Sequence, residues 1–280
     1  MYKLVALDID GTTYGTDHKI SKKVHDTIQE ARKKGVKFSL ISGRGPNDIE
    51  GISEELDLEP HTLIGCLNGS IVKTVESDDF ILNKTLTEED VKNCIKLTDE
   101  MNFAAFVYVG NNVYVKSNKD EFVILQNKFT YEETREVGDL TKFLEENDLL
   151  DKVNKIGIAN EYDELLKFKD RFIDENINNG QLLFSLPFYL ELIHEGTSKG
   201  NALKYIADKL NIKREETIAM GDGENDIDML KYAGLGIAMG NAFSNVKEEA
   251  DFITLSNKED GVAYAIDKFI LKKQKIYLKI

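Results

Sequence analysis

The sequence has little of what marks secreted or membrane-spanning proteins. It contains only two cysteines, Cys66 and Cys94, and their spacing fits neither a disulfide framework nor a zinc site. It has no run of about 18 apolar residues, so we expect no membrane-spanning helix. Its first residues enter a strand pattern without the long apolar block of a secretory leader. These absences favour a cytoplasmic protein.

Basic residues are outnumbered by acidic ones: the chain has 36 Lys and Arg and 50 Asp and Glu, which gives a net charge of −14. A charge of this sign disfavours nucleic acids and anionic membranes as partners. The Gly-x-x-x-x-Gly-Lys sequence of P-loop proteins is missing, which disfavours nucleotide hydrolysis of that type. Internal repeats and low-complexity linkers are missing as well. We expect a monomer or a small homo-oligomer.

The two ends of the chain share an alternation of strand and helix patterns. Short apolar runs separated by amphipathic helices, which begin near Ser21 and Pro46, favour strands of a parallel sheet with right-handed crossovers. We expect these strands at residues 4–7, 36–41, 63–67, 217–220, 235–239 and 252–255. A chain of 280 residues that is 41% apolar has room for one large domain or two modest ones.

The middle of the chain has a different pattern. Apolar runs joined by short turns predict hairpins at 71–82, at 103–115 and around Pro187, with helices between them, one of which starts at Thr87. Such a pattern is typical of an α+β domain with an antiparallel sheet. We therefore expect an α/β core made of residues 1–82 and 190–280, interrupted by an inserted α+β domain at 83–189.

An acidic pair follows the first predicted strand, in Asp8-Ile9-Asp10-Gly11-Thr12. Two residues apart on an extended strand end, Asp8 and Asp10 can face the same way. One carboxylate can then attack phosphorus while the other transfers a proton to the leaving oxygen. Gly11 allows an anion to approach the backbone, and Thr12 offers hydrogen bonds. The alternative is a helix cap or an acidic pocket of the receiver type.

A second acidic string, Gly221-Asp222-Gly223-Glu224-Asn225-Asp226, follows a strand near the other end of the chain. Carboxylates before a helix are also common as caps, but a cap accounts for one acid and not for the whole string. If both strands lie in one parallel sheet, their carboxyl ends bring Asp8, Asp10 and Asp222 together. Crowded carboxylates need a cation, and Mg²⁺ prefers such ligands. Asn225 and Asp226 can support the metal or orient a basic residue.

Two further places add candidates for binding phosphate. Ser42 and Gly43, followed by Arg44, end a predicted strand, where a hydroxyl and backbone N–H groups can hold a phosphate oxygen. The alternative is a turn of small residues. Lys199 stands at a predicted helix start, where the helix dipole disfavours a cation, so we expect it to neutralise the metal–phosphate cluster.

Taken in their order along the chain, from Asp8 through Ser42 and Lys199 to Asp222, these four motifs resemble those of the haloacid dehalogenase superfamily of phosphatases, and more closely its Cof-type branch with a large type IIB cap. The resemblance implies a Rossmann-like core and an inserted cap that selects the substrate. It also implies that Asp8 is the nucleophile and Asp10 the general acid and base. Mg²⁺ would bind the carboxylates of Asp8 and Asp222 and the backbone carbonyl of Asp10.

By the same resemblance, Ser42, Lys199 and Asn225 would hold the transferring phosphoryl group of a small phosphomonoester such as a sugar phosphate. The chain departs from the family at Thr13-Tyr14, where leucines or similar residues are usual. Two alternatives stay open: a hexose phosphomutase, which would return phosphate to a sugar, and a non-catalytic, metal-dependent binding or regulatory protein. Retention of both Asp8 and Asp10 argues against the second.

Overall fold

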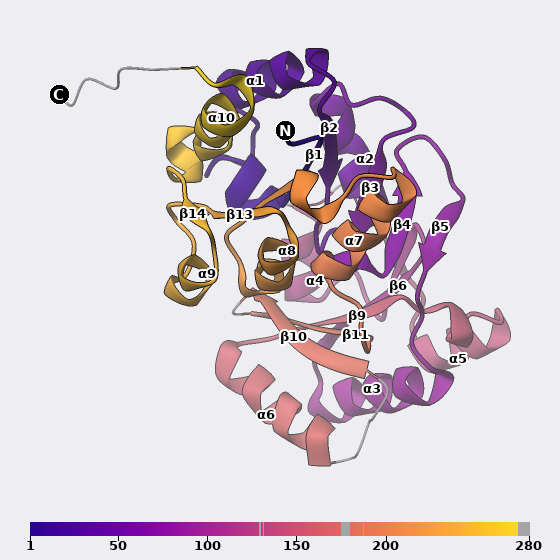
Figure 1. Ribbon diagram of the computed structural model, residues 1–280. Helices are drawn as coiled ribbons and strands as arrows, with labels where there is room; N and C mark the ends of the chain where they lie inside the picture. The colour runs from indigo at the N-terminus through magenta and orange to yellow at the C-terminus, as the bar shows by residue number, and fades with distance from the viewer. Residues whose placement is uncertain (129, 131, 175–179, 187, 274–280) are drawn as a thin grey trace.

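The apolar runs at both ends of the chain meet in one parallel sheet (Figure 1). This computed structural model describes residues 1–128, 130, 132–174, 180–186 and 188–273. The strands, in order across the sheet, are β14 (Phe252–Ile253), β13 (Leu235–Ala238), β12 (Thr217–Gly221), β1 (Leu4–Leu7) and β2 (Lys37–Leu40). All neighbours run parallel, which confirms the sheet that the strand–helix alternation predicts.

Helices pack against this sheet in two groups. α1 (Lys22–Lys33), which is capped by the Ser21 hydroxyl as predicted, contacts α10 (Gly261–Ile266). α7 (Lys199–Lys209) contacts α8 (Ile227–Tyr232), and both lie in the orange segment of Figure 1. The other helices of this part are α2 (Pro46–Glu55) and α9 (Ser244–Glu248).

The strand expected at 63–67 lies only partly in the parallel sheet. β3 (Leu63–Cys66) meets the end of β2 through a single parallel bridge, from Ile41 to Gly65. Along its length it pairs antiparallel with β4 (Ile71–Thr74), which pairs with β5 (Phe80–Asn83). The hairpin predicted at 71–82 is thus confirmed, and β3 is its third strand.

A second, mixed sheet is built from the middle of the chain. Its strands, in order, are β10 (Gly180–Leu186), β11 (Tyr189–His194), β9 (Lys155–Ala159), β6 (Ala104–Val109), β7 (Asn112–Val115) and β8 (Thr134–Glu136). All pairs are antiparallel except β7 with β8. The predicted hairpins at 103–115 and 182–193 are confirmed, while Pro187 lies outside the described residues.

The two faces of this second sheet have different neighbours, because alternate residues of a strand point to opposite faces. In β6, Ala105 and Val107 pack with the outer helices, whereas Phe106 and Tyr108 join the apolar cluster of the parallel sheet. The outer helices are α3 (Glu88–Met101), which starts after Thr87 as predicted, α5 (Leu140–Glu146) and α6 (Tyr162–Asp174). α4 (Glu121–Gln126) contributes Val123 to the inner face.

The chain passes between the two sheets after β5 and again after β11. We propose that these two connections divide the chain into a core and an inserted domain, close to the expected 1–82, 83–189 and 190–280. Since β11 pairs within the second sheet up to Ile193 and His194, we place the second boundary after residue 194. In the part of the chain that the structure describes, no helix combines the length and the apolar character needed to cross a membrane.

Candidate active site

The two acidic motifs meet because the strands before them are neighbours. Leu7 at the end of β1 lies beside Met220 of β12 in a parallel register, and the N–H of Asp8 donates to the Met220 carbonyl at 3.0 Å. Asp8 and Asp222 therefore leave the same edge of the sheet, where parallel sheets bind their ligands. This juxtaposition is the one that the sequence predicts.

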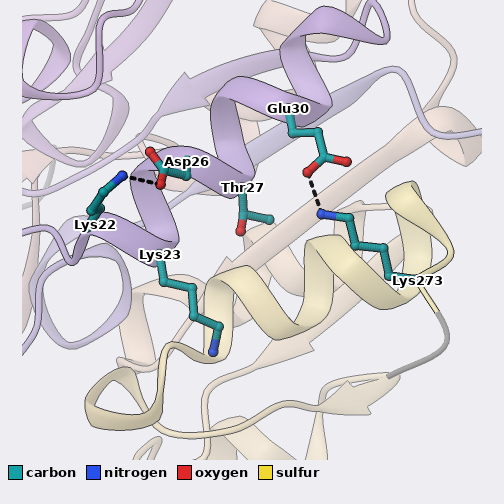
Figure 2. Close-up of a pocket in the computed structure, with 6 residues that line it drawn as sticks. All are labelled: Lys22, Lys23, Asp26, Thr27, Glu30 and Lys273. Atoms are coloured by element: carbon teal, nitrogen blue, oxygen red, sulfur yellow. Dashed lines mark hydrogen bonds and ion pairs between the residues drawn. The ribbon is translucent and has the colours of Figure 1, made fainter. Parts of the chain in front are cut away.

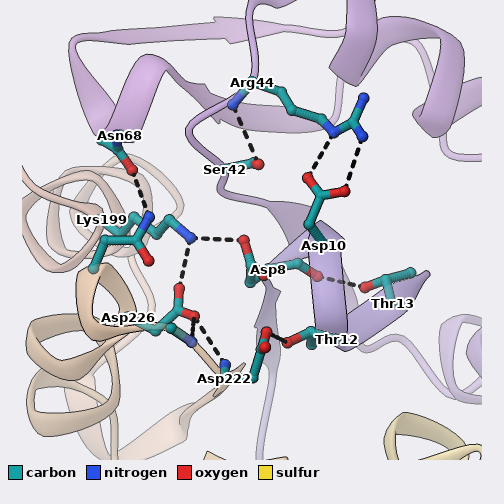
Figure 3. A network of polar contacts seen from close by, with 12 residues as sticks. Asp8, Asp10, Thr12, Thr13, Ser42, Arg44, Asn68, Lys199, Asp222 and Asp226 are labelled. Atoms are coloured by element: carbon teal, nitrogen blue, oxygen red, sulfur yellow. Dashed lines mark hydrogen bonds and ion pairs between the residues drawn. The ribbon is translucent and has the colours of Figure 1, made fainter. Parts of the chain in front are cut away.

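Three carboxylates and one amine form the centre of the site (Figure 3). Oxygen atoms of Asp8, Asp222 and Asp226 all lie within 4.8 Å of one another. The buried amine of Lys199 donates to Oδ1 of Asp8 and to Oδ1 of Asp226, each at 2.6 Å. The position of Lys199 at the start of α7, unfavourable for a cation by the helix dipole, is thus offset by two carboxylates.

Asp226 organises the second acidic loop. Its Oδ2 accepts hydrogen bonds from the backbone N–H groups of Asp222 and Gly223, both at 2.9 Å, while its Oδ1 accepts from Lys199. The close approach needs Gly221, since a Cβ there would lie 2.4 Å from Cγ of Asp226. With both oxygens held inside the protein, Asp226 supports the cluster and is poorly placed to be a principal metal ligand.

The loop after β1 closes over the other side of Asp222. Thr12 donates its hydroxyl to Oδ1 of Asp222 at 2.9 Å, and the Thr13 hydroxyl donates to the backbone carbonyl of Asp8 at 2.6 Å. Gly11 has a φ of +76°, and a Cβ there would lie 2.2 Å from Oδ2 of Asp222. The sequence singles out Gly11 and Thr12, but the contact made by Thr13 was not foreseen.

Asp10 faces away from the three carboxylates. Nε and Nη2 of Arg44 donate to its two oxygens at 2.7 and 2.8 Å, and Nη1 of Arg44 donates to the buried Asp48 at 3.2 Å. Burial acts to lower the pKa of Arg44, but the bonds to Asp10 raise it above its ordinary value. The expectation that the Asp10 carboxylate joins those of Asp8 and Asp222 is therefore wrong for this structure, because Arg44 holds it away and Asp226 takes the third place in the cluster. The metal contact that the resemblance implies for Asp10 concerns its backbone carbonyl.

The remaining predicted residues line the same edge of the sheet. Ser42 is buried, and its hydroxyl oxygen accepts the N–H of Arg44 at 3.3 Å. The side-chain amide of Asn225 donates to Oδ1 of Asn68 at 3.0 Å. Ser42, Gly43 and Asn225 line one cavity together with Asp8, Asp10, Gly11, Lys199, Asp222 and Asp226.

The electrostatics of the cluster favour a bound cation. Burial first, and then the charge of Asp226, raise the pKa of Asp8 well above its ordinary value, although Lys199 acts to lower it. The same two causes raise the pKa of Asp222 to about 7. One amine does not balance the acids, and clustered carboxylate oxygens are the donors that Mg²⁺ prefers. The donor set therefore fits a divalent metal.

The cavity extends from the acidic cluster to the second sheet and has a volume of about 710 Å³. The buried amine of Lys155 in β9 donates to Oε1 of Glu191 in β11 and to the Gly43 carbonyl, both at 2.8 Å. Asn68 in turn donates to Oε2 of Glu191 at 2.5 Å. These contacts tie the second sheet to the Ser42 loop. These contacts were not predicted, although Lys155 and Glu191 are charged residues within apolar strand runs of the sequence.

A smaller hollow of about 370 Å³ lies elsewhere, between α1 and the last helical turns of the described chain (Figure 2). Lys22 pairs there with Asp26 at 2.5 Å, and Lys273 pairs with Glu30. Because these exposed charged side chains form ion pairs with one another, we assign no ligand to this hollow.

Comparisons with known proteins agree with this geometry. A family model described as haloacid dehalogenase-like hydrolase matches residues 5–266. The Bacillus subtilis protein YxeH is 31% identical over 278 residues, which cover 98% of this chain and 100% of YxeH. The 5-amino-6-(5-phospho-D-ribitylamino)uracil phosphatase YcsE of the same organism is 32% identical over 269 residues, with 96% of each chain covered. A haloacid dehalogenase-like hydrolase from Bacteroides thetaiotaomicron has a similar structure, with a TM-score of 0.87 and 31% identity over 96% of this chain and 99% of that one.

Proposed function

Because this chain belongs to the haloacid dehalogenase-like hydrolases and is a phosphatase of that family, we propose that it hydrolyses small phosphorylated metabolites with Mg²⁺ through an aspartyl-phosphate on Asp8. One observation supports this proposal above the others. Asp8, Asp222 and Asp226 converge within 4.8 Å at the sheet edge, with the amine of Lys199 buried among them. Such a site can stabilise the charge of a transferring phosphoryl group.

Asp8 is our proposed nucleophile because Lys199 fixes its Oδ1 at 2.6 Å and leaves the second oxygen for attack. A bond forms between this oxygen and phosphorus while the bond from phosphorus to the leaving oxygen breaks. Water then attacks the phosphorus of the aspartyl-phosphate, and the Asp8 carboxylate departs. The product is inorganic phosphate.

Asp10 is our proposed proton donor to the leaving oxygen and proton acceptor from the attacking water. In the structure both of its oxygens accept hydrogen bonds from Arg44. The mechanism therefore includes a rotation of the Asp10 side chain from Arg44 toward the substrate. Arg44, itself held by the buried Asp48, provides a defined resting position for this group.

We propose that Asp8, Asp222 and the backbone carbonyl of Asp10 hold Mg²⁺. When bound, the metal neutralises part of the charge on the phosphoryl oxygens. Lys199 orients Asp8 and adds a positive charge beside the phosphoryl group. Ser42, Asn225 and the backbone N–H groups at Gly11, Thr12 and Gly43 would hold the phosphoryl oxygens, which leaves Asp226 as a support for Lys199 and the second loop.

The test is phosphate release from p-nitrophenyl phosphate by wild type, Asp8→Asn and the control Asp170→Asn, an exposed acid on α6. We expect release that needs Mg²⁺, stops with EDTA and falls at least about a thousand-fold in Asp8→Asn only. Acid quenching during turnover should leave a phosphoryl group on the peptide that contains Asp8, detected by mass spectrometry. Undiminished release by Asp8→Asn would refute the covalent mechanism.

A further inference from the structure

Apolar side chains from three separate elements surround the outer part of the active-site cavity. Phe122 and Leu125 belong to α4, Phe188 to the turn before β11, and Phe243 to the loop before α9. We call these four residues the apolar rim. Two of its members come from different parts of the chain, since Phe188 directly precedes β11 of the second sheet and Phe243 belongs to the parallel-sheet core.

Phe243 is placed directly beside the acidic cluster. Its backbone N–H donates to the carbonyl of Asp222 at 3.4 Å, and the residue immediately precedes α9. Phe188 lies at the end of the second sheet, directly before β11, and its carbonyl accepts the N–H of Asn160 at 3.3 Å. Both residues line the cavity that extends from Asp8 to the second sheet.

Both rings are unusually open to solvent for their type. Phe243 is 63% exposed and Phe188 is 40% exposed, although large aromatic side chains gain most from burial. Neither ring belongs to the apolar clusters that hold the two sheets together. An exposed apolar patch at the mouth of a cavity is typical of a surface that a ligand covers.

The charged part of the cavity wall offers little to a charged leaving group. Each Lys and Arg that lines its described part already contacts a carboxylate: Arg44 contacts Asp10 and Asp48, Lys155 contacts Glu191, and Lys199 contacts Asp8 and Asp226. A second phosphate or a carboxylate on the substrate would compete with Glu191 for Lys155 and with Asp48 for Arg44, even after Asp10 has rotated away from Arg44. The uncharged polar side chains of this wall include Gln126, Thr130 and Ser185, and His18 lines it as well.

From the open rings and the paired charges, we propose that the apolar rim selects phosphomonoesters whose leaving group carries an aromatic ring. Phe188 and Phe243 would stack against the two sides of this ring while the phosphoryl group lies at Asp8. This inference rests on the proposed phosphatase function. It concerns which phosphomonoester is preferred and leaves the chemistry of the step unchanged.

The experiment compares kcat/KM for benzyl phosphate and glycerol 3-phosphate, which are both esters of primary alcohols, so their leaving oxygens are chemically similar. We expect wild type to prefer benzyl phosphate by about ten-fold or more, the scale of discrimination that an apolar pocket provides. The ratio of the two kcat/KM values should fall several-fold in Phe188→Ala and in Phe243→Ala. Phe188→Tyr and Phe243→Tyr, which keep the ring, should restore it.

The control is Ile173→Ala on α6, a side chain that is 61% exposed and lies outside the cavity wall. Its ratio should equal that of wild type. Equal use of both esters by wild type, or a preference that persists in both alanine variants, would overturn the inference. Failure of wild type to hydrolyse either ester or p-nitrophenyl phosphate would instead overturn the proposed phosphatase function, so the two failures are distinct.

Discussion

Among single residues, Gly11 sets how closely the two acidic loops approach each other. A Cβ at this position would lie 2.2 Å from Oδ2 of Asp222, and the φ of +76° disfavours any other residue. We predict that Gly11→Ala displaces Asp222 and lowers Mg²⁺-dependent phosphate release by about a hundred-fold or more. Calorimetric titration with Mg²⁺ should show weakened binding.

Gly35 supplies the matched control for this variant. Its φ is +86°, but a Cβ there would meet nothing within 4 Å. Gly35→Ala therefore introduces the same backbone strain, about 1 kcal/mol, without the clash. If Gly35→Ala lowers activity as much as Gly11→Ala does, strain and not the contact with Asp222 is responsible.

Glu132 gives a prediction on pH. Burial first, and then the charge of Asp48, raise its pKa from 4.5 to about 7. Since the folded state binds the proton more tightly than the unfolded state, the resulting stability is complete below about pH 4.5 and is lost as the pH rises through about 7. Glu132→Gln cannot ionise, so it should exceed wild type in stability at pH 8, by at most about 3 kcal/mol, and match it at pH 4.

Urea unfolding of both proteins across this pH range measures the difference directly. The control is Glu133→Gln, because Glu133 is the exposed neighbour of the buried Glu132. If Glu132→Gln exceeds wild type in unfolding free energy by the same amount at pH 4 and at pH 8, the difference in stability comes from packing and not from ionisation.

At the scale of strands and helices, local pattern predicted most of the parallel sheet. The buried run Leu4–Leu7 and the capping residues Ser21 and Thr87 carry their information within a few residues, so they could be identified. β8, at Thr134–Glu136, is three residues long and exists through its parallel pairing with β7, which no local pattern contains. α4 was missed as well, and with it part of the apolar rim.

The residues of the candidate site, too, could be predicted where a local motif identifies them and could not where their position depends on strand pairing. Asp8, Asp222 and Lys199 stand in motifs and could be named from the sequence, whereas the pair of Lys155 and Glu191 depends on the strand register. Glu191 lies opposite Gly157, and Lys155 lies opposite Ile193, so the two charges share a face only because β9 and β11 pair in this register. The sequence marks both residues as parts of strands but does not contain their alignment.

This pair yields a prediction for the two strands. Lys155→Met leaves the buried Glu191 with an amide donor, Asn68, but without its cation. We predict a loss of about 3–5 kcal/mol in the free energy of unfolding, measured with urea. The double variant with Glu191→Leu should recover much of this loss, since it removes both charges. If the loss of unfolding free energy in the double variant equals the sum of the losses in the two single variants, the pair is not coupled.

Over the whole molecule, the excess of acids at the sheet edge predicts stabilisation by metal. Mg²⁺ bound to the folded chain alone should add about 3 kcal/mol at a concentration about a hundred times its Kd. We predict that the unfolding temperature rises with Mg²⁺, returns to its starting value with EDTA, and responds little in Asp222→Asn. The exposed control Asp170→Asn should respond as wild type does. An equal response of Asp222→Asn would place the stabilising ion elsewhere.

The two passages of the chain between the sheets lie side by side. The amine of Lys84, just after β5, donates to the carbonyl of Gly196, just after β11, at 2.9 Å. The segment from Lys84 to Gly196 therefore leaves the core and returns to it at neighbouring positions. A genetic exchange of this segment for another would leave the strand order of the parallel sheet intact. Such an exchange would replace Phe122, Leu125 and Phe188 of the apolar rim, whereas Phe243 and the acidic loops would stay with the core.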